Sequence, residues 1–257
     1  QVTYTTNTGS SSTLDVKITP VNDAPTAFNA ALATLEDTPL VLSSKNFNFS
    51  SVDNKALASV TITTLPLATA GTLQYKADNG NWVNVTLNQV ITAADIDAGR
   101  LQFAPTLNAS GATSFGFKVS DGTLTSTLAY TTSIAITPVD DASVLRADTF
   151  ASAEDLVSTG NVLTNDSDVD NTLSVASFKI AGLDGTYAAG ASVVLAGKGT
   201  FTIASTGVYT FTPVANWNGD IPQVTYTTNT GSSSTLDVKI TPVNDAPTAL
   251  NASLRTL

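Results

Sequence analysis

The sequence predicts an all-β protein built from tandem antiparallel β-sandwiches with Greek-key topology. Short segments in which apolar and polar residues alternate, such as GRLQFAP, SFGFKVS and GVYTFTP, recur along the chain. Turn sequences such as DNGN, SDG and AGKG separate them. No segment has a sustained helical pattern, although Ala93–Gly99 could form one helical turn.

The alternation also indicates which side chains form the cores. Phe115, Phe117 and Val119 share one face of their predicted strand, and Tyr209 and Phe211 share one face of theirs. The tryptophans, Trp82 and Trp217, stand beside turns. Each is alone, so we favour caps over a sandwich end above a sugar-stacking platform.

An internal repeat defines the organisation of the chain. Gln1–Ala27 recurs letter for letter at Gln223–Ala249, and ITPVDDAS at Ile136–Ser143 is a degenerate copy of its junction sequence ITPVNDAP at Ile18–Pro25. We therefore expect a stretch of a longer tandem-repeat protein. The expected parts are the C-terminal hairpin of a preceding module (residues 1–20), two sandwich modules (21–139 and 140–243), and a linker with the first strand of a following module (244–257).

Composition excludes several functions. Cysteine, methionine and histidine are absent, which removes thiolate nucleophiles, imidazole bases and soft metal ligands and leaves hard oxygen ligands. A net charge of −10 argues against nucleic acid as a partner. No apolar run is long enough for a membrane helix, so we expect no membrane insertion.

Acidic and amide residues gather at three kinds of place. These are the junctions (Asn22, Asp23; Asp140, Asp141), a Glu–Asp pair about a dozen residues later (Glu36, Asp37; Glu154, Asp155) and a loop further on (Asp53; Asp166, Asp168, Asp170). We expect all three to lie near one pole of a module. Carboxylates that converge with few lysines and arginines nearby would share a cation, and the D-x-D-x-D-N run favours Ca²⁺ over Mg²⁺.

Paired carboxylates can also hydrolyse glycosides. Here the pairs recur once per module, at turns and junctions, and no groove lined with aromatic residues accompanies them. We therefore expect no enzymatic activity.

Several motifs carry a family resemblance: VNDAPT, TLEDTPL, SAEDLV and GNVLTNDSDVDNTLSV. They resemble the cadherin-like tandem repeats of giant bacterial surface proteins, including RTX adhesins, and GTFTIASTGVYTFTPVANWNG is similar to the VCBS-type variant. The resemblance implies Ig-like or cadherin-like sandwiches, rigidified by calcium and located outside the cell on a Gram-negative bacterial surface, that project a distal ligand-binding domain.

The resemblance also implies which residues share the ions between modules. At the first junction these are Asn22, Asp23, Glu36, Asp37 and Asp53, and at the second Asp140, Asp141, Glu154, Asp155, Asp166, Asp168 and Asp170. The sequence departs from the pattern twice. Asn229-Thr230-Gly231 replaces the closing turn Asp121-Gly122 in the second module, and VDDAS lacks the Asn and Pro of VNDAP.

The leading functional hypothesis is a spacer, because duplication lengthens a spacer but adds nothing to a single well-made site. Its partners would be neighbouring modules of the same chain. One alternative is a binding module for surface polysaccharide or for like modules on other cells, as in biofilm adhesion. Another is a structural filament or surface-layer subunit.

Overall fold

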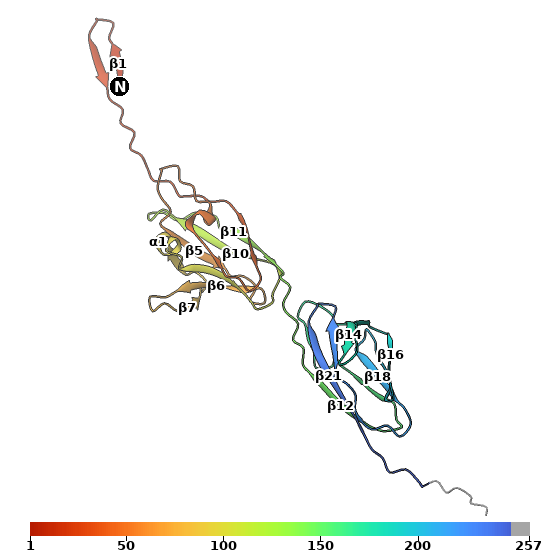
Figure 1. The fold of residues 1–257 in the computed structure, drawn as a ribbon. Coiled ribbons are helices and arrows are strands. Elements are labelled where there is room, and N and C mark those ends of the chain that lie inside the picture. The colour runs from red at the N-terminus through yellow and green to blue at the C-terminus, as the bar shows by residue number, and fades with distance from the viewer. Residues whose placement is uncertain (248–257) are drawn as a thin grey trace, which may run out of the picture. The chain divides into compact units, whose positions relative to one another are not determined.

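The computed structural model describes residues 1–247 and divides into two compact units, Gln1–Val139 and the part that begins at Asp140 (Figure 1). Each unit contains a β-sandwich, and the all-β fold class is confirmed. The strand predicted for the following module falls largely in residues 248–257, outside the described residues.

Unit 1 begins with a hairpin of β1 (Val2–Thr5) and β2 (Ser11–Leu14), which form a sheet of their own. One sheet of its sandwich has the order β3 (Ala30–Leu35), β11 (Tyr130–Thr137), β10 (Gly111–Ser120), β5 (Ser59–Thr64), β8 (Val90–Thr92). The other has the order β4 (Leu40–Val41), β9 (Leu101–Pro105), β6 (Gly71–Lys76), β7 (Trp82–Asn84).

Two short helices lie in the connections of unit 1, η1 (Ser44–Phe47) and α1 (Ala93–Asp97). The second is the predicted helical turn. It begins after Thr92, whose Oγ1 accepts a hydrogen bond from the amide of Asp95 at 3.1 Å and so caps the helix.

Unit 2 repeats this plan. Its first sheet has the order β12 (Asp148–Ala153), β21 (Ser233–Thr241), β20 (Val224–Thr228), β14 (Val175–Ile180), β15 (Tyr187–Ala188), with β19 (Gly219–Asp220) also paired to β21. Its second sheet has the order β13 (Ser158–Asn161), β18 (Val208–Pro213), β17 (Gly199–Ile203), β16 (Ser192–Leu195).

Each sandwich departs from a purely antiparallel arrangement at one pairing. The first strand pairs in parallel with the last, β3 with β11 and β12 with β21. Both strands of such a pair run in the same direction because the chain enters each sandwich at one pole and leaves it at the other. We call the pole where the first strand starts the N-terminal pole and the pole where the last strand ends the C-terminal pole.

The predicted core residues are confirmed. Phe115, Phe117 and Val119 are buried in the core of unit 1, and Tyr209 and Phe211 in that of unit 2. The tryptophans differ in their surroundings. Trp217 packs edge-on against Phe211 and the core of unit 2, whereas Trp82 lies partly exposed on the edge strand β7 beneath the Lys76 ammonium.

Candidate cation sites at the N-terminal poles

The N-terminal pole of unit 1 gathers oxygen ligands from three distant parts of the chain. The Asp23 amide donates to Asp53 Oδ2 at 2.7 Å, and Asn22 Nδ2 donates to Asp121 Oδ2 at 2.9 Å. Asp121 comes from the Asp-Gly turn that follows β10. Its Oδ1 accepts hydrogen bonds from the backbone amides of Thr123 and Leu124. These backbone bonds, with the Asn22 amide, hold the pKa of Asp121 below its usual range, so the carboxylate is charged at neutral pH.

One atom at this pole has no partner. Asn22 Oδ1 is buried and accepts no hydrogen bond, whereas its Nδ2 donates to Asp121 Oδ2 and to the Asp23 carbonyl. A buried acceptor without a donor costs free energy, so it needs either a donor or a cation. The pole therefore offers an orphaned amide oxygen beside the carboxylates Asp53 and Asp121.

Unit 2 builds the corresponding pole with different side chains. The Asp141 amide donates to Asp170 Oδ2 at 2.7 Å, as Asp23 does to Asp53. Asn171 Nδ2 donates to Asp140 Oδ1 at 2.7 Å. The two residues after Val139 are thus fastened to the D-x-D-N loop by hydrogen bonds at both positions.

Asp168 organises this loop. Its Oδ1 accepts the amides of Asp170 and Asn171, and its Oδ2 accepts the Ser143 hydroxyl at 2.6 Å. The Ser143 bond, together with these amides, lowers the pKa of Asp168, so it too is charged at neutral pH. Thr230, from the turn that replaces Asp-Gly, lies 2.7 Å from the same serine oxygen and compensates for the lost aspartate with a hydroxyl.

The prediction that the Glu–Asp pairs share this pole is wrong. Glu36 Oε1 accepts the amide of Val139 at 2.5 Å, and Glu154 Oε1 accepts the amide of Val243 at 2.6 Å. Both glutamates are buried at the C-terminal poles, at the far ends of β3 and β12. The separation arises because the pair follows the first strand, which has by then crossed the whole sandwich.

The pairs also have a local structural role. The chain leaves one sheet after β3 and joins the other at β4, and Asp37 makes this turn in the left-handed region at φ 56°. Asp155 does the same at φ 63° in unit 2. Aspartate tolerates this conformation better than most residues, and each Oδ1 also accepts a backbone amide, that of Asn108 or Asn216.

Glu154 is held more tightly than a surface acid. Besides the Val243 amide, its Oε2 accepts Asn218 Nδ2 at 2.9 Å. The Asn218 bond and the Val243 amide lower the pKa of Glu154. Because a depressed carboxyl pKa stabilises the fold only while the group is charged, this contribution is present above the ordinary glutamate pKa and is lost as pH falls through the lowered one.

Asp166 belongs to a third environment. Its Oδ1 accepts the Arg146 amide, and its Oδ2 accepts the Tyr226 hydroxyl at 2.7 Å. The buried carboxyl of Asp148 lies 3.2 Å from the same hydroxyl. Asp166 thus faces the interior of unit 2, apart from the Asp168 and Asp170 interactions.

The substitution Asp148→Asn is expected to stabilise unit 2 at neutral pH. Burial raises the pKa of Asp148, with Asp166 adding to the effect, so its ionised form opposes folding. Because the folded-state pKa of this carboxyl is raised, the free energy of unfolding falls as pH rises from its unfolded-state pKa to its folded-state pKa. Above the folded-state pKa the full destabilisation is present. The variant should unfold at a higher temperature at pH 7 and lose part of this pH dependence. Thermal unfolding from pH 3 to 8 measures both, and a lower midpoint at pH 7 would contradict the assignment.

Among residues 1–247, no cluster of three or more acidic side chains has the geometry of a metal site. Each N-terminal pole instead contributes two carboxylates with amide or hydroxyl oxygens beside them, which is part of the six to eight oxygens that Ca²⁺ takes. The orphaned Asn22 Oδ1 and the hard-oxygen donor set fit this ion. Asp121 was not among the predicted ligands, although its Asp-Gly turn is visible in the sequence, because only strand pairing brings residue 121 beside residue 22.

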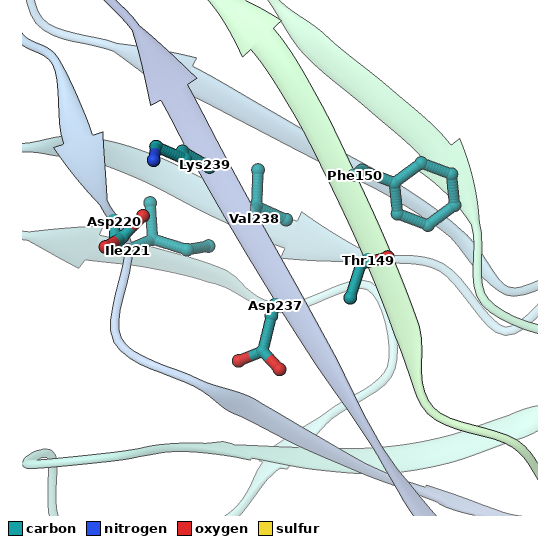
Figure 2. A pocket seen from close by; sticks show the side chains of 7 residues that line it. All are labelled: Thr149, Phe150, Asp220, Ile221, Asp237, Val238 and Lys239. Carbon is teal, nitrogen blue, oxygen red and sulfur yellow. The ribbon is translucent and has the colours of Figure 1, made fainter.

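A surface hollow on unit 2 is a weaker candidate. It is lined by Thr149, Phe150, Asp220, Ile221, Asp237, Val238 and Lys239 (Figure 2). Asp237 already accepts Gln223 Nε2 at 3.1 Å, and no buried, unpartnered polar atom of the described residues lines the hollow. It therefore contains no group that requires a ligand.

Residues 140–243 match the sequence model of the bacterial cadherin-like domain. The fold of unit 2 is thus that of a cadherin-like β-sandwich. Cadherin-like domains as a class are extracellular modules of adhesion-type proteins and generally bind calcium. No curated protein sequence matches the chain. None of the helices within residues 1–247 has the length and apolar character of a membrane span.

Solved structures with similar arrangements are distant in sequence. The extracellular domains 1–4 of Drosophila N-cadherin align at 12% identity with a TM-score of 0.41, over 87% of this chain and 50% of theirs. Protocadherin gamma B7 domains 1–4 align at 14% and 0.40, over 88% and 53%. The endo-fucoidan hydrolase MfFcnA4 aligns at 15% and 0.30, over 89% and 30%. The chain thus spans about half or less of each of these structures.

Proposed function

We propose that this chain is a calcium-stiffened extender of a large bacterial surface adhesin, of the RTX type, that holds a distal ligand-binding domain away from the cell. The observation that carries the proposal is the equivalent fastening of the incoming chain in both units. Asp53 and Asp170 accept the amides of Asp23 and Asp141 at the same distance, although the surrounding residues differ.

The chain between the sandwiches is held at both of its ends. Glu36 of unit 1 holds the Val139 amide, and in unit 2 Asp170 holds the Asp141 amide. Only Asp140 stands between these two anchored residues, and its carboxylate accepts Asn171 Nδ2. A linker this short and this acidic supports stiffness controlled by a cation, as a spacer requires.

Calcium would be held at each N-terminal pole. In unit 1 the ligands would be Asn22, Asp53 and Asp121, and in unit 2 Asp140, Asp168 and Asp170, with Asp23 and Asp141 contributing beside them. When bound, the ion neutralises carboxylates that otherwise repel one another over a Debye length of about 8 Å. The Glu–Asp pairs lie at the C-terminal poles, where they accept backbone amides: Glu36, Asp37, Glu154 and Asp155. Asp166 accepts the Tyr226 hydroxyl inside unit 2.

The proposal includes the absence of catalysis. The Glu–Asp pairs that resemble an acid and base in sequence each accept backbone amides at a turn, which is a structural role. Every such feature occurs once per unit, which suits a repeated spacer.

Calcium removal is the test. Small-angle scattering and calorimetry of the full chain with calcium, and then with chelator, should show a shorter maximum dimension and a lower unfolding midpoint for unit 2 without the ion. A ligand bound only by the folded state at 100 times its Kd adds about 2.7 kcal/mol to stability. The double variant Asp168→Asn, Asp170→Asn should behave in calcium as the parent does in chelator.

A matched control removes two charges elsewhere on unit 2. Asp184 and Asp220 are exposed and lie away from the D-x-D-N loop, so Asp184→Asn, Asp220→Asn should keep the full calcium response. If chelation left the maximum dimension and the midpoint unchanged, calcium stiffening would be refuted.

A further inference from the structure

The hairpin at the start of the chain and the last hairpin of unit 2 have the same sequence and the same local structure. Val2 pairs with Leu14 as Val224 pairs with Leu236, and the register is identical along both ladders. The turns match as well, since Gly9 donates to the Thr6 carbonyl as Gly231 does to that of Thr228. The hairpin therefore forms from local interactions alone, without the rest of a sandwich.

What differs is the burial of the apolar face. In unit 2 this face is in the core, where Tyr226, Val238 and Ile240 are at most 2% exposed. Their counterparts Tyr4, Val16 and Ile18 are 54%, 65% and 87% exposed. An apolar face of this size without a partner marks an interaction surface.

Strand length gives an independent sign that a partner is missing. In unit 2 the second strand continues from Ser233 to Thr241, because β12 and β19 pair with its far half. In the first hairpin the same residues form a strand only as far as Leu14. Residues 15–18 have strand-forming sequence but no neighbouring strand among the described residues to bond with.

We infer that the hairpin of residues 1–20 completes a β-sandwich with strands of the sequence of residues 140–222 when a second copy of that segment lies beside it in the same chain. The structure itself shows the complementary surface. β14 pairs with β20 and β12 with β21, so the same strands of a second copy would flank β1 and β2. This inference involves no cation and stands apart from the proposed function.

The test extends the full chain by a copy of residues 140–222, joined through its Pro222 directly to Gln1. The chain contains no cysteine, so single thiols report burial without background. In the parent chain the Val16→Cys thiol should react rapidly and the Val238→Cys thiol slowly. In the extended chain the thiol at position 16 should react on the order of 100-fold more slowly than in the parent, approaching the rate at position 238.

A control extension carries Phe178→Asp within the added copy, which places a charge in the core opposite the position of Tyr4. It should leave the thiol at position 16 as reactive as in the parent. Calorimetry should show one additional cooperative transition for the intact extension and none for the control. An unprotected thiol in the intact extension would overturn the inference, and so would protection found only in oligomers by sedimentation.

Discussion

Ile240→Ala is expected to lower the free energy of unfolding of unit 2 by about 2 to 5 kcal/mol. Ile240 is fully buried on β21, between β12 and β19, so truncation removes apolar contacts and leaves a cavity. The same substitution at Ile18, which has the identical sequence context but is 87% exposed, should change stability by less than about 0.5 kcal/mol. Calorimetry or urea unfolding of the full chain measures both.

The paired design separates sequence from environment. Both variants remove the same atoms from the repeated sequence shared by Gln1–Ala27 and Gln223–Ala249, so any difference must come from tertiary surroundings. Equal effects at the two positions would show that the first hairpin is already packed against a partner.

Tyr226→Phe is expected to destabilise unit 2 by about 2 kcal/mol, because hydrogen bonds to charged groups contribute about 1.5 to 3 kcal/mol. The Tyr226 hydroxyl donates to Asp166 Oδ2 at 2.7 Å inside the sandwich, and burial raises its own pKa, so it remains a donor at neutral pH. For a unit of this size the unfolding midpoint should fall by about 10 °C.

The matched variant is Tyr4→Phe. The Tyr4 side chain is 54% exposed, and the substitution there should leave both unfolding transitions unchanged. Restoring stability to Tyr226→Phe by adding Asp166→Asn would identify the lost bond to Asp166 as the cause. A Tyr226→Phe variant as stable as the parent would mean that the hydroxyl contributes nothing to the fold.

Much of the fold could be predicted because its signals are local. Alternation in SFGFKVS and GVYTFTP placed Phe117 and Phe211 in the cores, and the segment Ala93–Gly99 was expected to form the helical turn that is α1. The parallel pairing of β3 with β11 could not be predicted in this way. Alternation shows which face of a strand is buried but not which strand lies beside it.

The candidate sites divide along the same line. Sequence alone established the acidic composition, the repeat, and the oxygen-rich loop around Asp168, because each depends on residues close together in the chain. Only the tertiary structure showed that Glu36 lies at the pole opposite Asp23, that Asp166 faces inward to Tyr226, and that Asp121 joins Asn22. These placements depend on the direction and length of whole strands. One strand carries the chain across the entire sandwich, so residues a dozen positions apart lie at opposite poles while residues 22 and 121 meet.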